Sequence, residues 1–195
     1  MSRHILLIEG HPDAGADHLC DALSAAYAQG AQAAGHEVRR VAVNTLDFPL
    51  LRSKAEWDTG PVPPPLQPVQ QDILWAEHLV FVFPLWLGGM PALLKGFLEQ
   101  VARPGFAMSR PAKGEFPKKL LGGRSARLVV TMGMPALVYR VIYRAHSLKA
   151  LERNILGFVG IAPVHETLVG MVEGVSDAQR QKWLQRLHEL GGQGR

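Results

Sequence analysis

The sequence predicts an α/β fold in three layers, with a five-stranded parallel sheet between helices on both faces. Five short apolar runs alternate with stretches of helical periodicity, which is typical of parallel strands joined by crossover helices. The run from Leu79 to Phe83 is apolar at every position, as expected of a strand buried on both faces. Five such strands favour the order 2-1-3-4-5, and 195 residues suit a single domain over 1–195.

In the first half of the chain, apolar spacing and glycine positions place the elements. Leu19, Leu23 and Tyr27 lie four residues apart on one face of a helix, and Gly35 follows where that helix would end. The stretch from Phe48 to Pro68 holds six prolines, so we expect an irregular flap or surface excursion there. The predicted elements are a strand over Ile5–Ile8, a helix from about Ala16, a strand over Val38–Val43, and a helix over Val69–Glu77.

In the second half, the third strand breaks at Pro84 and a loop leads to a helix. This helix is predicted to begin at Met90-Pro91, because proline suits the first helical turn. A second loop-rich segment runs from Pro104 to Gly123. The remaining predicted elements are a strand over Arg127–Thr131, a helix over Ser147–Phe158, a strand over Ile161–Leu168, and a last helix from Ser176-Asp177 with a frayed tail from Gly191.

Composition limits the classes of partner and compartment. A formal net charge of +4 and a pI near 9.5 weakly favour anionic ligands, but no run of Lys and Arg with interleaved aromatics points to nucleic acid. The one cysteine, Cys20, leaves no disulfide within the chain, which fits a reducing, cytoplasmic setting. The N-terminus shows no signal-peptide pattern. Pro84, Gly88 and Pro91 interrupt the longest uncharged stretch, which disfavours insertion into a membrane.

Three loops are expected to meet at one edge of the sheet, because they follow the first, third and fourth strands of a parallel sheet. They comprise residues 11–16, 84–89 and 131–134. The first loop precedes a helix, whose free N–H groups suit a phosphate. The other two are apolar and contain glycines, which let a planar ligand approach the backbone closely. No spaced-glycine dinucleotide fingerprint and no P-loop is present, which disfavours a nucleoside triphosphate.

Nucleophilic and metal chemistry find little support in the sequence. No Gly-x-Ser-x-Gly elbow occurs, and Cys20 lies within the first helix, where a buried structural thiol is favoured. His4, His11 and His18 recur every seven residues, but they would lie in a strand, a loop and a helix, so no metal is expected. We therefore infer that a cofactor brings the reactive group. A flavin suits the three loops, with its phosphate at the first helix and its ring between the other two.

The residues also resemble a known family. The most specific stretch is FPLWLGGMPALLKGF, Phe83 to Phe97, followed by PGFAM, Pro104 to Met108. Supporting positions are His11-Pro12, Gln71, Thr131 and the segment from Tyr139 to Ile161. Over nearly its whole length the chain resembles the flavodoxin-like NAD(P)H:quinone oxidoreductases, which include bacterial relatives that assist potassium-efflux systems.

The resemblance implies FMN or FAD as cofactor, NAD(P)H as reductant, and two-electron ping-pong reduction of a quinone-like acceptor by a homodimer. It places Tyr139 near the pyrimidine edge of the flavin, assisted by His146, as the catalytic residues. Phe106 and Met108 are implied in the acceptor pocket at the subunit interface. The cofactor-binding residues that it implies are His11, Asp17, His18, Gln71, Pro84, Leu85, Trp86, Leu87, Gly88, Thr131, Met132, Gly133 and Met134.

Other functions stay open at this point. A reductase of azo or nitro compounds is not separable from a quinone reductase by sequence. A flavodoxin-like regulatory subunit would dock peripherally on a membrane transporter, and Lys113, Lys118 and Lys119 form a basic segment suited to docking. An electron-carrier flavodoxin is disfavoured by the basic charge and by the long loops, which suggest a substrate pocket. The acceptor, the nicotinamide and the choice between FMN and FAD are also open.

Overall fold

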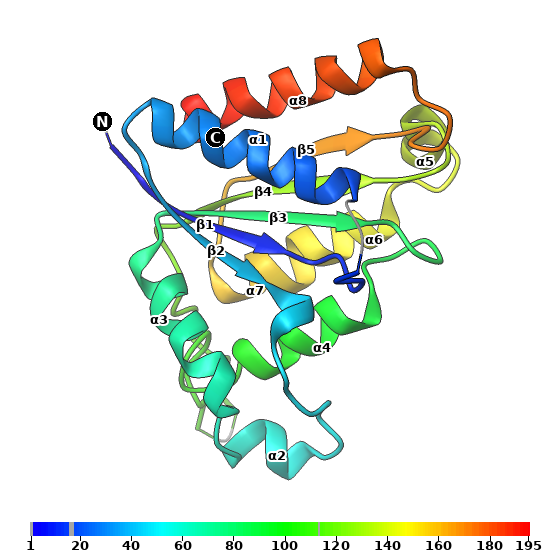
Figure 1. Cartoon of the computed structure of the whole chain (residues 1–195). Helices are drawn as coiled ribbons and strands as arrows, with labels where there is room; N and C mark the ends of the chain where they lie inside the picture. Colours follow the sequence, from blue (N-terminus) through cyan, green and yellow to red (C-terminus); the bar gives the residue numbers. More distant parts are fainter. Residues whose placement is uncertain (1, 16–17, 113) are drawn as a thin grey trace.

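The parallel sheet and its strand order are as predicted. The computed structural model describes residues 2–15, 18–112 and 114–195. Its five strands are all parallel, in the order β2-β1-β3-β4-β5 (Figure 1), so the fold is the predicted flavodoxin-like α/β sandwich. The strands are β1 (His4–Glu9), β2 (Glu37–Ala42), β3 (His78–Pro84), β4 (Ser125–Thr131) and β5 (Val164–Val169).

Helices cover both faces of the sheet. One face is covered by two long helices, α1 (Leu19–Ala33) and α8 (Asp177–Gly192) (Figure 1). The opposite face carries α3 (Gln67–Trp75), α4 (Ala92–Val101), and a continuous run formed by α6 (His146–Lys149), the π-helical η3 (Ala150–Leu156) and α7 (Gly157–Val159). Shorter elements are η1 (Val43–Thr45), α2 (Lys54–Thr59), η2 (Pro64–Leu66) and α5 (Ala136–Val141).

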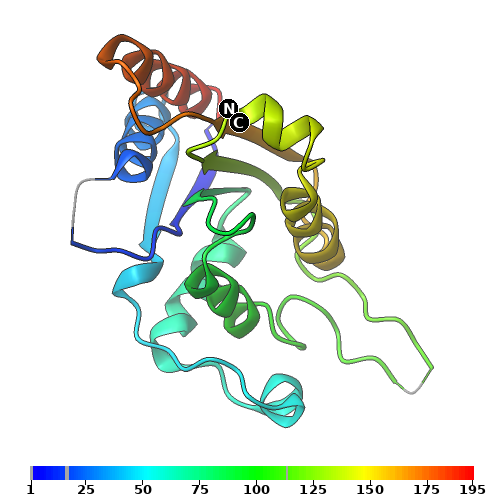
Figure 2. The same cartoon turned by 90° about the vertical axis from the view of Figure 1, so that its right-hand side faces the viewer.

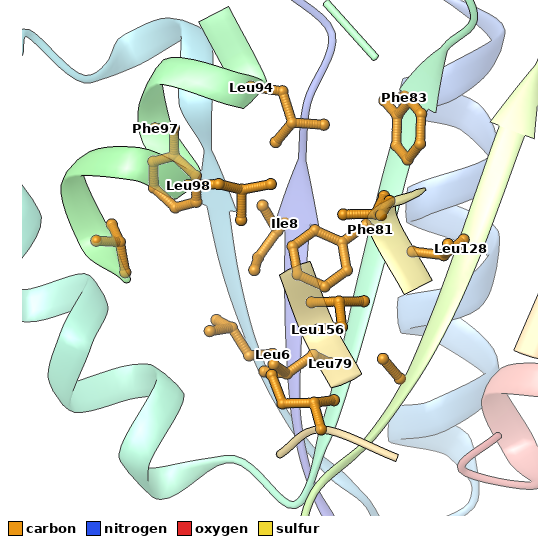
Figure 3. Close-up of a cluster of buried hydrophobic side chains, with 14 of the residues drawn as sticks. Leu6, Ile8, Leu79, Phe81, Phe83, Leu94, Phe97, Leu98, Leu128 and Leu156 are labelled. Carbon is orange, nitrogen blue, oxygen red and sulfur yellow. The ribbon is translucent and has the colours of Figure 1, made fainter. Parts of the chain in front are cut away.

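The core lies on the two faces of β3, as its apolar run predicts. All seven residues of β3 are buried. Leu79, Phe81 and Phe83 point to the face of α4, where they meet Leu94 and Phe97 (Figure 3). Val80 and Val82 point to the other face, against α1 and α8. The alternation of side chains along a strand therefore gives each helical layer its own half of the core.

The helices α1 and α8 approach each other at backbone distance. A Cβ atom on Gly30 would lie 1.9 Å from the carbonyl oxygen of His188, and one on Gly191 would lie 2.1 Å from that of Tyr27. Only glycine fits at such a crossing. The predicted frayed tail from Gly191 is therefore wrong: α8 continues to Gly192, and the Tyr27 hydroxyl donates to the main-chain oxygen of Arg195 at 3.3 Å.

The proline-rich stretch from Phe48 to Pro68 is not irregular throughout, contrary to prediction. It contains α2, which Ser53 caps by accepting the N–H of Glu56 at 3.1 Å, while Glu56 accepts the N–H of Arg52 at 3.0 Å. Arg103, only 5% exposed, holds this segment against α4. Its Nη1 donates to the carbonyl oxygens of Glu56 at 2.7 Å and Gly60 at 2.8 Å, and its Nη2 donates to Gln100.

Other differences concern the ends of elements and one short helix. The predicted helix over Ser147–Phe158 is confirmed as the run from α6 to α7, but α5 was not predicted. Pro84 is the last residue of β3 rather than a break, and Pro91 precedes α4 as its N-cap. The helix α3 begins two residues before Val69. Among the described residues, no helix is both long and apolar enough to cross a membrane.

Candidate functional site

The three predicted loops meet at the edge of the sheet where the strands end. Figure 2 looks onto this edge and shows the loops after β1, β3 and β4 around it. The N–H of Gly10, just after β1, donates to the carbonyl oxygen of Val82 at 2.8 Å, and the N–H of Leu85 donates to that of Thr131 at 2.8 Å. Backbone hydrogen bonds thus continue past the strands and hold the bases of the three loops together.

The first loop leaves β1 beneath α4. A Cβ atom on Gly10 would lie 2.7 Å from Leu94 Cδ2, so the chain passes close under that helix. His11 follows and is 9% exposed. Its Nδ1 lies 3.2 Å from the backbone nitrogen of Asp13 and 3.3 Å from the carbonyl oxygen of the same residue, so the ring can accept or donate there according to its tautomer. These contacts hold the His11 ring in one orientation.

The rings of His11 and His18 stack at the start of α1. Their centroids are 3.7 Å apart and their planes are inclined by 21°. His11 also meets Trp86 of the second loop edge-on, at 5.9 Å between centroids. Burial, then the neighbouring His18, lowers the pKa of His11, so its imidazole is neutral at pH 7. His11, His18 and Trp86, all predicted to bind the cofactor, are thus brought together.

Two carboxylates accept hydrogen bonds from backbone N–H groups just before α1. Asp13 Oδ1 accepts the N–H of Gly15 at 2.8 Å, and Asp21 Oδ2 accepts that of His18 at 3.2 Å. The hydrogen bond from Gly15 is the main cause of a lowered pKa at Asp13, with His18 adding to it. Asp13 Oδ2 also lies 3.1 Å from His18 Nε2. Asp17, a predicted cofactor residue, lies outside the described residues.

The second loop is a tight turn that presents apolar side chains to solvent. Trp86 and Gly89 exchange two backbone hydrogen bonds of 2.9 Å. The residues between them, Leu87 and Gly88, have positive φ values of 47° and 77°, as in a type I′ hairpin turn. Trp86 is 51% exposed and Leu87 is fully exposed, and the space beside Gly88 is open. A leucine held in the left-handed region costs about 1 kcal/mol or more, and the two backbone hydrogen bonds between Trp86 and Gly89 offset part of this cost.

The third loop is more buried. Thr131 is 5% exposed, and its Oγ1 lies 3.2 Å from Cys20 Sγ of α1. Burial raises the pKa of Cys20 to about 11, against a smaller opposing effect of Thr131, so the predicted structural thiol is confirmed. Met132 is buried and Met134 is half-buried, whereas Gly133 is exposed. The rim of the site therefore offers backbone at Gly133 rather than side chains.

Tyr139 of α5 lies behind this rim and is only 2% exposed. Its hydroxyl completes no hydrogen bond with the described residues. Burial raises the pKa of the phenol, against smaller opposing effects of Ser147 and of the backbone of Leu148. Ser147 Oγ would lie 3.6 Å from a Cβ atom on Gly89. The Tyr139 phenol is thus protonated and lies beside Ser147 and the backbone of Leu148, and its catalytic role stays a prediction.

The remaining predicted residues show no described contact with the three loops, and their roles stay predictions. Gln71 is exposed on α3 and His146 is exposed at the start of α6. Phe106 packs against the core of the α4 face. Met108 lines a separate cleft of about 200 Å³ along α4 and η3–α7, and none of the cleft's lining residues belongs to the three loops. Among the described residues, no group of three His, Cys, Asp or Glu side chains is placed to hold a metal ion.

Asp13 and Ser147 are the contributors that the sequence did not indicate as site residues. The role of Asp13 could have been predicted, because an Asp two residues before a Gly is typical of a turn in which the carboxylate accepts a backbone N–H. Ser147 had no such signal, since its position near Gly89 depends on how α6 packs.

Comparison with known proteins shows which proteins the chain resembles over part of its length. A curated NAD(P)H oxidoreductase of uncharacterized function from Haemophilus influenzae is 30% identical over 129 residues, which are 66% of this chain and 63% of that protein. An FMN-dependent NADH:quinone oxidoreductase from Bordetella petrii is 34% identical over 110 residues, 53% of this chain and 48% of that one. The chain thus spans less than two thirds of the length of these relatives.

A solved structure and a family model extend the likeness to the whole chain. The NAD(P)H:quinone oxidoreductase from Methanothermobacter marburgensis superposes over 100% of both chains with a TM-score of 0.81 at 23% identity, which shows the common fold. The family model Flavodoxin_2, described as a flavodoxin-like fold, matches residues 3–190. With that match over nearly all of its sequence, and with the strand order and loop edge described above, the chain belongs to the Flavodoxin_2 family.

Proposed function

We propose that this protein is a flavin-dependent NAD(P)H oxidoreductase that carries out two-electron reduction of quinones or similar acceptors, with FMN or FAD at the edge formed by the three loops. The observation that carries the proposal is the exposed turn from Trp86 to Gly89, which lies against the paired rings of His11 and His18. An exposed indole beside accessible glycine backbone suits a flat, apolar ring. The curated relatives named as FMN-dependent quinone oxidoreductases support FMN.

The described residues fit the ring of a flavin better than its phosphate. Trp86 and Leu87 offer exposed apolar surface, and Tyr139 is a buried donor without a partner. At the phosphate end, His18 Nε2 already lies 3.1 Å from the Asp13 carboxylate, and the carboxylates of Asp13 and Asp21 already hold N–H groups of that loop. A phosphate has to compete with these carboxylates for the same donors.

Each part of the site has a distinct task in this proposal. A bound flavin supplies hydride chemistry, accepting from a nicotinamide and donating to an acceptor. Trp86 and Leu87 would cover the ring and exclude water, and the open space beside Gly88 would allow close approach, whereas a Cβ atom on Gly133 would lie 3.6 Å from the carboxylate of Glu173. The Tyr139 hydroxyl, with its raised pKa, stays protonated and can donate where negative charge develops.

We also propose the homodimer and the cytoplasmic setting that the resemblance and the composition imply. Support for the dimer comes from exposed apolar side chains of α5 and its neighbours beside the site: Leu87, Leu137, Val141, Ile142 and Tyr143. Such a patch is typical of a surface that another chain covers. Analytical ultracentrifugation of the protein and of a Leu137→Asp, Val141→Asp double variant tests this, since a wild-type monomer contradicts it.

The function is tested by the visible spectrum. The purified protein, incubated with FMN or FAD and desalted, is expected to stay yellow, to be bleached by NADH or NADPH without oxygen, and to be recoloured by a quinone. An azo dye as second acceptor compares the two acceptor classes. A protein that takes up neither flavin, or that holds one which no nicotinamide reduces, contradicts the proposal.

Trp86→Ala is expected to weaken flavin binding by about tenfold or more, because a half-exposed indole that covers a ring loses about 1.4 kcal/mol or more of contact free energy. Fluorescence titration of the apoprotein with FMN measures it. Phe116→Ala is the matched control, since Phe116 is a 95% exposed aromatic residue of the 104–123 loop. An unchanged dissociation constant for Trp86→Ala places the ring elsewhere.

Asp13→Asn is expected to tighten FMN binding about two- to fivefold at low salt, because it removes a carboxylate that competes with the phosphate for the N–H groups before α1. The Asn side chain keeps an oxygen that can accept from Gly15. The same titration in low and high salt measures the effect, which should shrink as salt rises. Asp58→Asn on α2 serves as the control for the loss of a surface carboxylate. Weaker FMN binding by Asp13→Asn would show that this carboxylate supports the site instead.

A further inference from the structure

A polar cleft lies at the edge of the sheet where the strands begin, opposite the three loops. Its volume is about 410 Å³, and its lining includes Arg3, His78, Ser125, His165 and Arg195. The two ends of the described chain lie on this side of the molecule (Figure 1). Nothing in the flavin proposal uses this cleft.

The strand register explains why polar side chains gather there. Ile5 pairs with His78, His78 with Ser125, and Arg127 with His165. Side chains two apart share a face, so His78 and Ser125 lie on the same face as Val80, Val82 and Val129, which contact α1 and α8. The first residues of neighbouring strands on this face are therefore polar, and they lie just beyond the end of the apolar core.

His78 lies at the floor of the cleft, and one of its ring nitrogens has no hydrogen-bond partner within the described part of the chain. It is 1% exposed. Its Nδ1 lies 2.8 Å from Ser125 Oγ, whereas Nε2 makes no hydrogen bond with the described residues. A buried polar atom without a partner costs about 1–3 kcal/mol, so an atom of this kind at the edge of a polar cleft favours a group from the cleft, water or a ligand, that completes its hydrogen bond.

Positive charge surrounds this imidazole. Arg3 and Arg195 line the cleft, and Arg127 lies beneath it with its Nε donating to the main-chain oxygen of Arg195 at 2.7 Å. In the part of the chain that the structure describes, none of these three guanidinium groups pairs with a side-chain carboxylate. The one acidic residue of the lining, Glu77, accepts the N–H of His4 at 3.0 Å. Burial lowers the pKa of His165, and Arg127 and Arg195 lower it further.

We propose that this cleft binds a compact anion of the phosphate class, held by Arg3 and Arg195 and by the Nε2–H of a neutral His78. Guanidinium groups match the oxygen geometry of a phosphate. With the Ser125 hydroxyl donating to Nδ1, Nε2 carries the proton and becomes the donor that a phosphate oxygen accepts. One bound dianion thus supplies the missing partner of His78 and offsets the repulsion among the arginines.

The test is an NMR titration with inorganic phosphate at constant ionic strength, balanced with chloride. The ring signals of the histidines, assigned through His78→Gln and His165→Gln variants, are followed with the protein saturated with FMN where it binds. Saturable shifts at His78 and His165 are expected. Arg3→Gln should weaken the phosphate affinity about three- to tenfold, while Arg180→Gln, an exposed residue of α8, should change it less than about twofold.

Three outcomes overturn the proposal. The first is a response confined to His11 and His18, which would place phosphate only at the first loop. The second is a linear response without saturation, equal in wild type and Arg3→Gln, which would show unspecific screening. The third is equal saturation by acetate, which would exclude selectivity for the phosphate class. The histidine signals report phosphate binding whether or not flavin binds. A negative result therefore contradicts the anion cleft and leaves the proposed oxidoreductase function untouched.

Discussion

Between pH 6.5 and pH 3, His78 alone is expected to reduce the free energy of unfolding by about 1.4 kcal/mol per pH unit, or about 4–5 kcal/mol in all. Burial, then Arg127 and Arg3, lowers the pKa of this imidazole from 6.5 to about 3. Below pH 6.5 the unfolded chain binds a proton at His78 that the folded protein does not bind. Stability is therefore lost as the pH falls and is fully present above pH 6.5.

Urea unfolding at pH 7, 6, 5 and 4 measures this loss in wild type and in His78→Gln. The variant loses the hydrogen bond to Ser125, so it should be less stable at pH 7 but should fall less steeply with acid. His146→Gln, at an exposed position, is the control for removing a histidine. Because burial also lowers the pKa of His11 and His165, the quantity to compare is the difference between slopes. Parallel slopes for wild type and His78→Gln would contradict the assignment.

Gly30→Ala is expected to destabilise the protein by about 3 kcal/mol or more, or to prevent folding. The added Cβ would lie 1.9 Å from the carbonyl oxygen of His188 and 2.7 Å from its carbon. Both are backbone atoms, so no side-chain rotation relieves the overlap, and α8 has to move away from α1. The sign of the change in stability is informative, because replacing glycine by alanine in a helix without such a neighbour stabilises the protein by about 1 kcal/mol.

Gly122→Ala is the matched control, since nothing lies within 4 Å of its Cβ position. Circular dichroism and urea unfolding of the two variants give the comparison. An unfolded Gly30→Ala protein beside a folded Gly122→Ala protein supports the close crossing. Equal stability of Gly30→Ala and wild type would show that the helices are farther apart than described.

The strands were predictable because a strand buried on both faces is apolar at nearly every position, which is visible in the sequence. The run from Leu79 to Phe83 had to be a central strand once helices were assigned to both sides. The short helices were not predictable in the same way. In α2 the capping pair Ser53 and Glu56 was present, but six nearby prolines outweighed it. In α5 nearly every residue is apolar, including the exposed Leu137 and Val141, so no polar face alternates with an apolar one to mark a helix.

The position of the site followed from topology, whereas its contacts did not. Parallel strands end at one edge, so the meeting of the three loops could be predicted from element order alone. The placement of His4, His11 and His18 in a strand, a loop and a helix argued against a metal site, and it gave no sign that the rings of the last two stack. His4 instead stacks on Trp75 at 4.5 Å. Such pairings depend on loop conformation, which local sequence specifies weakly.

The buried guanidinium of Arg103 has a consequence for the mobility of the proline-rich segment. It fastens this segment to the end of α4 through hydrogen bonds to Glu56 and Gly60, while Gln100 of α4 holds the guanidinium in place. Each hydrogen bond to a charged group contributes about 1.5–3 kcal/mol, so a conformation with both bonds to the segment released is populated at about one part in a hundred or less. The stretch predicted as a flap or a surface excursion is therefore held to the body of the protein in nearly all molecules.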